Sequence, residues 1–156
     1  MTELLQKYYK NKISYNINTI ETVLINSNFN CGIFINRDKL FHLLKYKYKL
    51  HTLYDPCSYP GIQCKFYYNK KKKNNDGICE CEKMCTKKNK CAKKNSCVEI
   101  SFMVFRTGSI LIVGNCTDNI IQYIYNFLKK IIIDEYTKIY AGINIQIKKK
   151  KKTKKK

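Results

Sequence analysis

The sequence VEISFMVFRTGSILIVGN, residues 98–115, predicts the central element of the fold. It contains two apolar runs, 98–105 and 110–113, which are joined by Arg106-Thr107-Gly108-Ser109. Two such runs on either side of a short, glycine-containing connection are typical of a β-hairpin. We therefore expect two antiparallel strands that turn at Gly108.

Both faces of this predicted hairpin are largely apolar. Successive side chains of a strand point to opposite faces. One face then carries Ser101, Met103, Phe105, Leu111 and Val113, and the other carries Ile100, Phe102, Val104, Ile110 and Ile112. A hairpin with one face in water should instead alternate apolar and polar residues. Each face is thus expected to be covered, one by helices of the same chain and the other by something else.

The segments around the hairpin predict an α+β domain. Helices are expected at 2–11, at 37–49 after the capping residue Asn36, and at 118–135 after the capping residue Thr117. Strands are expected within 13–28, with a turn near 16–18, and at 62–68 and 140–147. The isoleucine stripe of the 118–135 helix is the predicted cover for one side of the sheet.

The positive charge is concentrated in two segments. The formal net charge is +20, and residues 70–94 hold ten lysines while residues 148–156 hold eight. We interpret residues 1–147 as one domain with a loop insertion at 69–96, followed by a disordered polylysine tail at 148–156. Lysine runs bind polyanions through phosphate contacts without sequence preference, so nucleic acid is the expected partner. A merely solubilising role for the runs stays open.

The nine cysteines are expected to be reduced thiols or metal ligands. The N-terminus lacks the pattern of a secretory signal, and no apolar run has the roughly 20 residues that a membrane span needs. We therefore expect an intracellular, reducing location without membrane contact. Within the insertion, four thiols could hold zinc, namely Cys79, Cys81, Cys85 and Cys91. The absence of a Cys-x-x-Cys pair leaves metal-free thiols as the alternative.

No residue pattern indicates catalysis. The two histidines are not near a serine or cysteine with an orienting partner, the carboxylates are scattered, and there is no glycine-rich phosphate loop. We do not expect an enzyme.

Two motifs, Tyr54-Asp-Pro-Cys-Ser-Tyr-Pro-Gly61 and Phe105-Arg-Thr-Gly-Ser-Ile-Leu-Ile-Val-Gly114, make residues 21–136 resemble one repeat of the TATA-box-binding protein family. Tyr54-Asp-Pro-Cys-Ser-Tyr-Pro-Gly61 is similar to the family's Tyr-Glu-Pro-Glu-Leu-Phe-Pro-Gly. Phe105-Arg-Thr-Gly-Ser-Ile-Leu-Ile-Val-Gly114 is similar to its Phe-x-Ser-Gly-Lys-x-x-x-Thr-Gly. The isoleucine-rich helix after Gly114 falls where the family has its long helix. Divergent members with such insertions resemble the TATA-binding-like proteins of giant DNA viruses.

The resemblance implies a curved antiparallel sheet with helices on its convex face and the DNA minor groove on its concave face. It implies a transcription initiation factor that binds A·T-rich DNA, in the host nucleus or a cytoplasmic viral factory. The DNA-binding positions would be Asn26, Tyr59, Lys65, Met103, Phe105, Leu111 and Val113. Among them, Tyr59 and Phe105 match wedge positions, Asn26 matches a base-contacting asparagine, and Lys65 lies near a phosphate-contacting arginine.

The sequence also departs from the family. Val113 replaces a threonine and Ser109 a lysine, so the chain could instead be a protein-interaction module that docks transcription factors or RNA polymerase subunits. In that case only the lysine-rich segments would contact DNA, without specificity.

Only one repeat is present. The implied open edge near 21–28 predicts a homodimer or pairing with a second repeat-containing chain. Light scattering at micromolar concentration measures this assembly.

Overall fold

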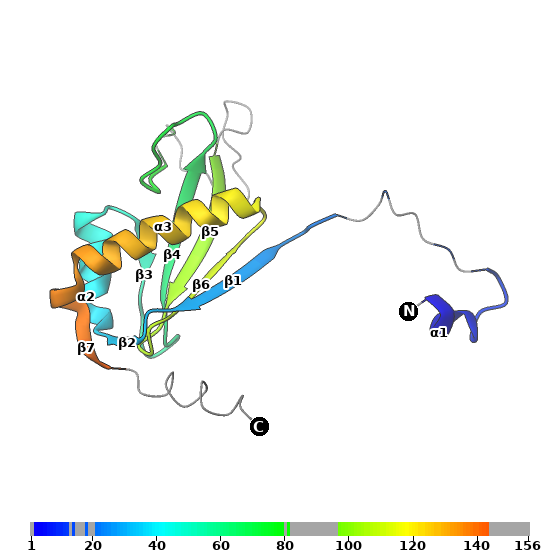
Figure 1. Ribbon diagram of the computed structural model, residues 1–156, viewed down its shortest axis with the longest axis horizontal. Coiled ribbons are helices and arrows are strands. Elements are labelled where there is room, and N and C mark those ends of the chain that lie inside the picture. Colours follow the sequence, from blue (N-terminus) through cyan, green and yellow to red (C-terminus); the bar gives the residue numbers. More distant parts are fainter. Residues whose placement is uncertain are drawn as a thin grey trace, which may run out of the picture.

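The predicted hairpin forms the centre of a five-stranded antiparallel sheet (Figure 1). In this computed structural model, which describes residues 2–12, 14, 18, 21–79, 81 and 97–143, the strand order is β1-β6-β5-β4-β3. The strands are β1 (Ile25–Asn30), β3 (His51–Leu53), β4 (Ile62–Asn69), β5 (Cys97–Val104) and β6 (Ser109–Gly114). The α+β class predicted from the sequence is therefore confirmed.

The turn between β5 and β6 requires glycine. Gly108 has a φ of +77°, and a Cβ atom there would lie 2.2 Å from the backbone oxygen of Ile33. The turn is closed by the Phe105 N–H, which donates to the Ser109 carbonyl at 2.9 Å, and by the Gly108 N–H, which donates to the Phe105 carbonyl at 3.0 Å. A side chain at position 108 would therefore clash as well as adopt an unfavourable backbone conformation.

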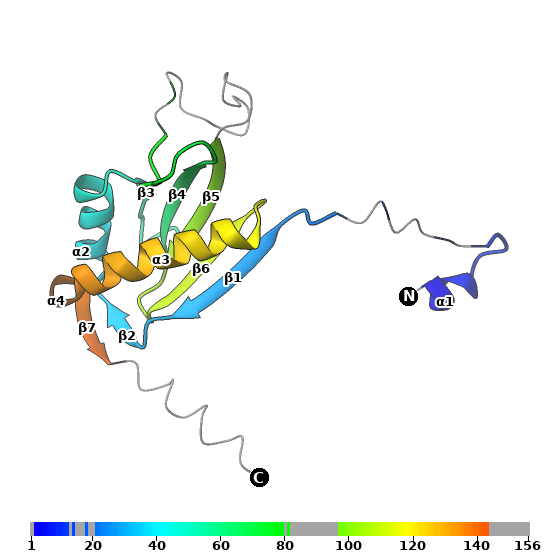
Figure 2. The ribbon, with the colours of Figure 1, turned by 45° about the horizontal axis from the view of Figure 1, so that its top comes forward.

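Helix α3 (Asp118–Asp134) crosses one face of this sheet (Figures 1 and 2). The five side chains predicted to share the covered face are all at most 1% exposed: Ile100, Phe102, Val104, Ile110 and Ile112. They form one core with the buried α3 residues Ile120, Ile124, Leu128 and Ile131. The predicted alternation of the hairpin and the predicted stripe of the helix are both confirmed.

The second helical segment begins where the sequence predicts. Asn36 caps α2 (Arg37–His42), and its side-chain oxygen accepts a hydrogen bond from the Lys39 N–H at 3.1 Å. The helix continues as a wider π-helical turn, η2 (Leu43–Lys47), and leads into β3. Strand β3 was not predicted.

A buried carboxylate joins this segment to the end of α3. Glu135 lies before α4 (Tyr136–Ile139), and its side chain is 1% exposed. It accepts hydrogen bonds from the ammonium groups of Lys138 and Lys47 and from the Tyr48 hydroxyl. The bonds from Lys138 and Lys47 lower the pKa of Glu135 to about 2. The carboxylate is thus ionised at physiological pH, and the two ammonium groups balance its negative charge.

The chain ends differ from the prediction. Helix α1 (Thr2–Gln6) is shorter than the expected 2–11, and among the described residues of the strand region 13–28 only those from Ile25 onward form a strand. The strand predicted at 140–147 is present over its described part as β7 (Tyr140–Ile143), and it pairs with β2 (Ile33–Ile35) in a second, two-stranded sheet. The described residues do not include 16 and 17 of the predicted turn, the tail 148–156, or the insertion beyond Cys79 apart from Cys81. None of the described helices has the length and apolar character that a membrane crossing needs.

Candidate nucleic-acid interface

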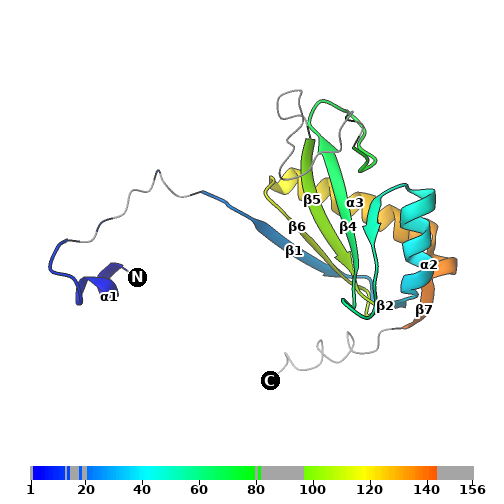
Figure 3. The same cartoon turned by 180° about the vertical axis from the view of Figure 1, so that it is seen from behind.

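The face of the sheet opposite α3 is not covered by any helix of the described part of the chain (Figure 3). We call it the open face. It carries His51, Leu53, Gln63, Lys65, Ser101, Met103, Leu111, Val113, Asn26 and Asn28, all of which are exposed or half-buried. The next residue of β4 on this face after Lys65 is Tyr67, which is only 2% exposed. The accessible part of the face along β4 therefore ends at Lys65. Five of the seven predicted DNA-binding residues, Asn26, Lys65, Met103, Leu111 and Val113, therefore lie on one accessible surface.

Strand register arranges the open face in two rows across the sheet. The first row is Asn26, Val113, Ser101, Lys65 and His51, and the second is Asn28, Leu111, Met103, Gln63 and Leu53. Apolar side chains occupy the middle of the second row and amides flank them. Such a surface can pack against a flat partner while its amides donate hydrogen bonds at either side.

Strand β1 contributes a ladder of asparagines, of which the sequence prediction included one. Asn26 is exposed on the open face as expected, and Asn28, two residues later, lies on the same face. Asn30 has a different role, because its amide nitrogen donates to the Ser109 hydroxyl at 2.9 Å and its oxygen accepts from the Gly32 N–H at 2.8 Å. The alternation in INSNFN could have identified Asn28 from the sequence.

The two predicted wedge residues meet at one end of the open face. The rings of Tyr59 and Phe105 are 6.0 Å apart between centroids, at an interplanar angle of 59°. Gly61 lies beside both, and a Cβ atom there would be 3.0 Å from each ring. The Tyr59 hydroxyl donates to the sulfur of Met103 at 3.4 Å. Glycine at position 61 thus allows the two half-buried rings to pack together.

The predicted phosphate-binding lysine has a partner within the protein. Lys65 Nζ lies 3.0 Å from Glu99 Oε1, and the two side chains are 35% and 19% exposed. The other Glu99 carboxylate oxygen is buried and accepts no hydrogen bond from the described residues. Lys65 keeps an accessible portion on the open face, but Glu99 offsets its charge.

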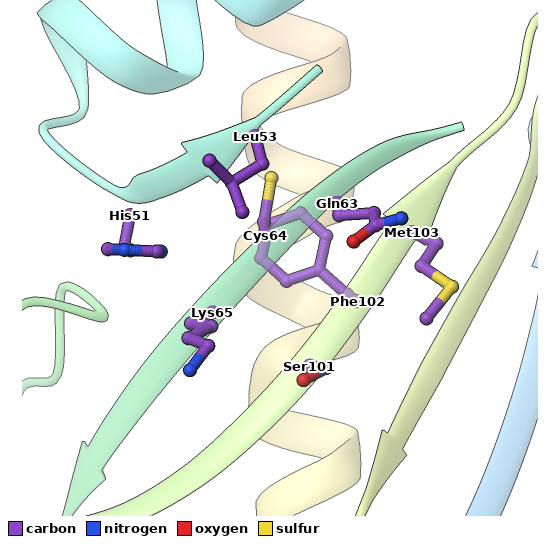
Figure 4. A pocket seen from close by; sticks show the side chains of 8 residues that line it. All are labelled: His51, Leu53, Gln63, Cys64, Lys65, Ser101, Phe102 and Met103. Atoms are coloured by element: carbon purple, nitrogen blue, oxygen red, sulfur yellow. The ribbon is translucent and has the colours of Figure 1, made fainter. Parts of the chain in front are cut away.

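A shallow hollow lies over β3, β4 and β5 on the open face (Figure 4). Its lining includes the side chains of His51, Gln63, Lys65 and Ser101 from the open face, with Cys64 and Phe102 from the core. Burial raises the pKa of the Cys64 thiol to about 12, so this thiol is protonated at neutral pH and acts as a packing residue.

Three cysteines converge at the other end of the β4–β5 hairpin. The sulfur atoms of Cys79, Cys81 and Cys97 lie within 4.8 Å of one another, so these residues could hold a metal ion. Cys79 and Cys81 belong to the predicted ligand set, whereas Cys97 does not. The other two predicted ligands, Cys85 and Cys91, lie outside the described residues. Cys97 could have been included from the sequence, because it begins the strand that follows the insertion.

Comparison with known proteins adds no relative: no family model, no curated protein and no solved structure matches the chain.

Proposed function

We propose that the chain is a TATA-box-binding-protein-like transcription initiation factor whose open face binds the minor groove of A·T-rich DNA. The observation that carries the proposal is the arrangement of the open face. Leu111 and Met103 lie between the amides of Asn28 and Gln63, and the aromatic pair of Tyr59 and Phe105 lies at one end of the face. The motifs around Tyr59 and Phe105 supply the resemblance, and the helix on the opposite face is compatible with it.

The chemistry of the open face suits the minor groove of A·T pairs. These pairs present only hydrogen-bond acceptors there, whereas G·C pairs add the amino group of guanine. The amides of Asn26, Asn28 and Gln63 can donate to such acceptors. The apolar side chains of Leu111 and Met103 offer no acceptor to the guanine amino group. The open face should therefore favour A·T over G·C pairs.

The aromatic pair supports the same proposal. Proteins that bind the minor groove often insert apolar side chains between base steps, and the TATA-box-binding protein is one of them. Tyr59 and Phe105 are half-buried and lie at the end of the open face, where they can reach a base step. The lysine-rich segments would add phosphate contacts that position the DNA without reading its sequence.

Strand β1 is the proposed site of assembly. It pairs with β6 on one side only, so its other edge has no strand partner among the described residues. Val23 and Leu24, just before it, are 67% and 57% exposed. A second copy, or another repeat-containing chain, would extend the open face along the DNA.

A second function is favoured by the weak charge of the open face. Glu99 neutralises Lys65, and positions 109 and 113 carry serine and valine. These features suit a module that docks a transcription factor or an RNA polymerase subunit, with DNA contact limited to the lysine-rich segments.

Removing most of the lysines of the two basic segments separates the two functions. We would omit residues 148–156 and replace the six lysines at 83–94 by glutamine. Residues 69–79 are kept, because Gly77 packs on Phe66 and Asn75 bonds to Tyr123. If the open face reads DNA, this variant should still bind an A·T-rich duplex about tenfold more tightly than a G·C-rich one at physiological salt. Equal affinities, or no binding, would support the docking function.

A further inference from the structure

The three-cysteine cluster lies at the point where the insertion leaves and rejoins the sheet. Cys97 is the first residue of β5 and is directly opposite Asn69, the last residue of β4. Cys79 and Cys81 come from the insertion itself, and all three are half-buried. A ligand held by all three residues would therefore connect the insertion to the mouth of the β4–β5 hairpin.

The first part of the insertion is held in place by its own contacts. The Asn75 side-chain oxygen accepts from the Asn69 N–H at 2.6 Å, and the Asn75 N–H donates to the Tyr123 hydroxyl of α3 at 2.7 Å. The Gly77 carbonyl accepts from the Tyr67 N–H at 3.0 Å. These bonds fix the chain two residues before Cys79.

Gly77 shows how closely this segment packs. Its φ is +83°, and a Cβ atom there would lie 2.6 Å from the ring of Phe66 and 2.7 Å from Leu50. Cys79 is thus brought to Cys97 by a segment that rests directly on the core. Packing of the chain against the core two residues earlier therefore sets the position of Cys79 beside Cys97.

The sulfur spacing suits a metal better than a disulfide. Zinc binds thiolates at about 2.3 Å in a tetrahedron, which separates the sulfurs by about 3.8 Å. The sulfurs of Cys81 and Cys97 are 3.9 Å apart. A disulfide would join two sulfurs at about 2.05 Å and leave the third without a role.

We infer that Cys79, Cys81 and Cys97 bind a zinc ion that closes the insertion at the mouth of the β4–β5 hairpin. Three thiolates and a fourth ligand, either a further cysteine or water, complete a tetrahedral site. This inference is independent of DNA binding.

Metal analysis of the full chain tests it. The protein, purified under reducing conditions and dialysed, should retain one zinc ion per chain. Cys97→Ser should weaken zinc binding about a hundredfold in competition with a chromogenic chelator. The matched control is Cys57→Ser, because Cys57 is exposed in the turn before β4 and lies outside the cluster. This control should bind zinc as the unaltered chain does.

Two further measurements report on the site itself. Cobalt in place of zinc should give sulfur-to-metal charge-transfer absorption that Cys97→Ser reduces and Cys57→Ser retains. Zinc should also slow amide hydrogen exchange at Asn69 and Val98, which flank the cluster. A chain without bound zinc, a Cys97→Ser variant with unchanged zinc affinity, or a Cys81–Cys97 disulfide would overturn the inference. None of these results bears on the DNA-binding proposal, which is measured separately.

Discussion

Replacing Leu111 by glutamate should strongly weaken DNA binding and leave the fold intact. Leu111 lies near the middle of the open face, between Asn28 of β1 and Met103 of β5. A carboxylate at this point would face the phosphates and base acceptors of the bound duplex, and such like-charge contact costs several kcal/mol. The affinity should therefore fall by about a hundredfold or more. Fluorescence anisotropy with a labelled A·T-rich duplex measures the change.

Ile133→Glu is the matched control for this experiment. Ile133 is an apolar residue of α3, on the covered side of the sheet, and is 63% exposed. The substitution changes the net charge of the protein equally but lies away from the open face. It should bind DNA as the unaltered chain does. Equal losses in the two variants would mean that charge alone, rather than the open face, controls binding.

The double substitution Tyr59→Ala with Phe105→Ala should remove DNA bending more than it removes affinity. The two rings pack against each other beside Gly61 and form the one aromatic pair at this end of the described open face. Without the two rings this end of the open face has lost its aromatic wedge, so the bend should be largely lost. Phosphate contacts persist, and the affinity should fall by only about tenfold.

Energy transfer between dyes at the two ends of a short duplex measures the bend. Tyr46→Ala serves as the control, because Tyr46 is an aromatic residue of η2 that is 63% exposed and does not lie on the sheet. It should leave the bend unchanged. If the unaltered chain does not bend the duplex at all, the wedge role of Tyr59 and Phe105 is wrong.

The parts of the fold that the sequence predicted are those with a strong local signal. Two-residue alternation correctly separated Phe102, which is buried, from Met103, which is not. The helical stripe at 118–135 and the capping residue Asn36 were equally visible, because each depends on neighbours within one or two turns.

The parts that were missed depend on contacts distant in sequence. Strand β3 has only three residues, which is too short for a two-residue alternation to be recognised in the sequence. It is a strand because it pairs with β4. The pairing of β7 with β2 joins segments about a hundred residues apart and likewise has no local signal. Cys97 was left out of the ligand set although its position directly after the insertion is visible in the sequence, because its closeness to Cys79 and Cys81 depends on the fold.

The most direct test of minor-groove binding is a duplex in which inosine·cytosine pairs replace the A·T pairs. In the minor groove such a pair lacks the guanine amino group and resembles A·T, whereas in the major groove it resembles G·C. The variant that lacks 148–156 and carries glutamine for the six lysines at 83–94 should bind the substituted duplex about as tightly as the A·T-rich one, because Asn26, Asn28 and Gln63 would meet the same acceptors. Binding as weak as that to the G·C-rich duplex would contradict minor-groove recognition by the open face.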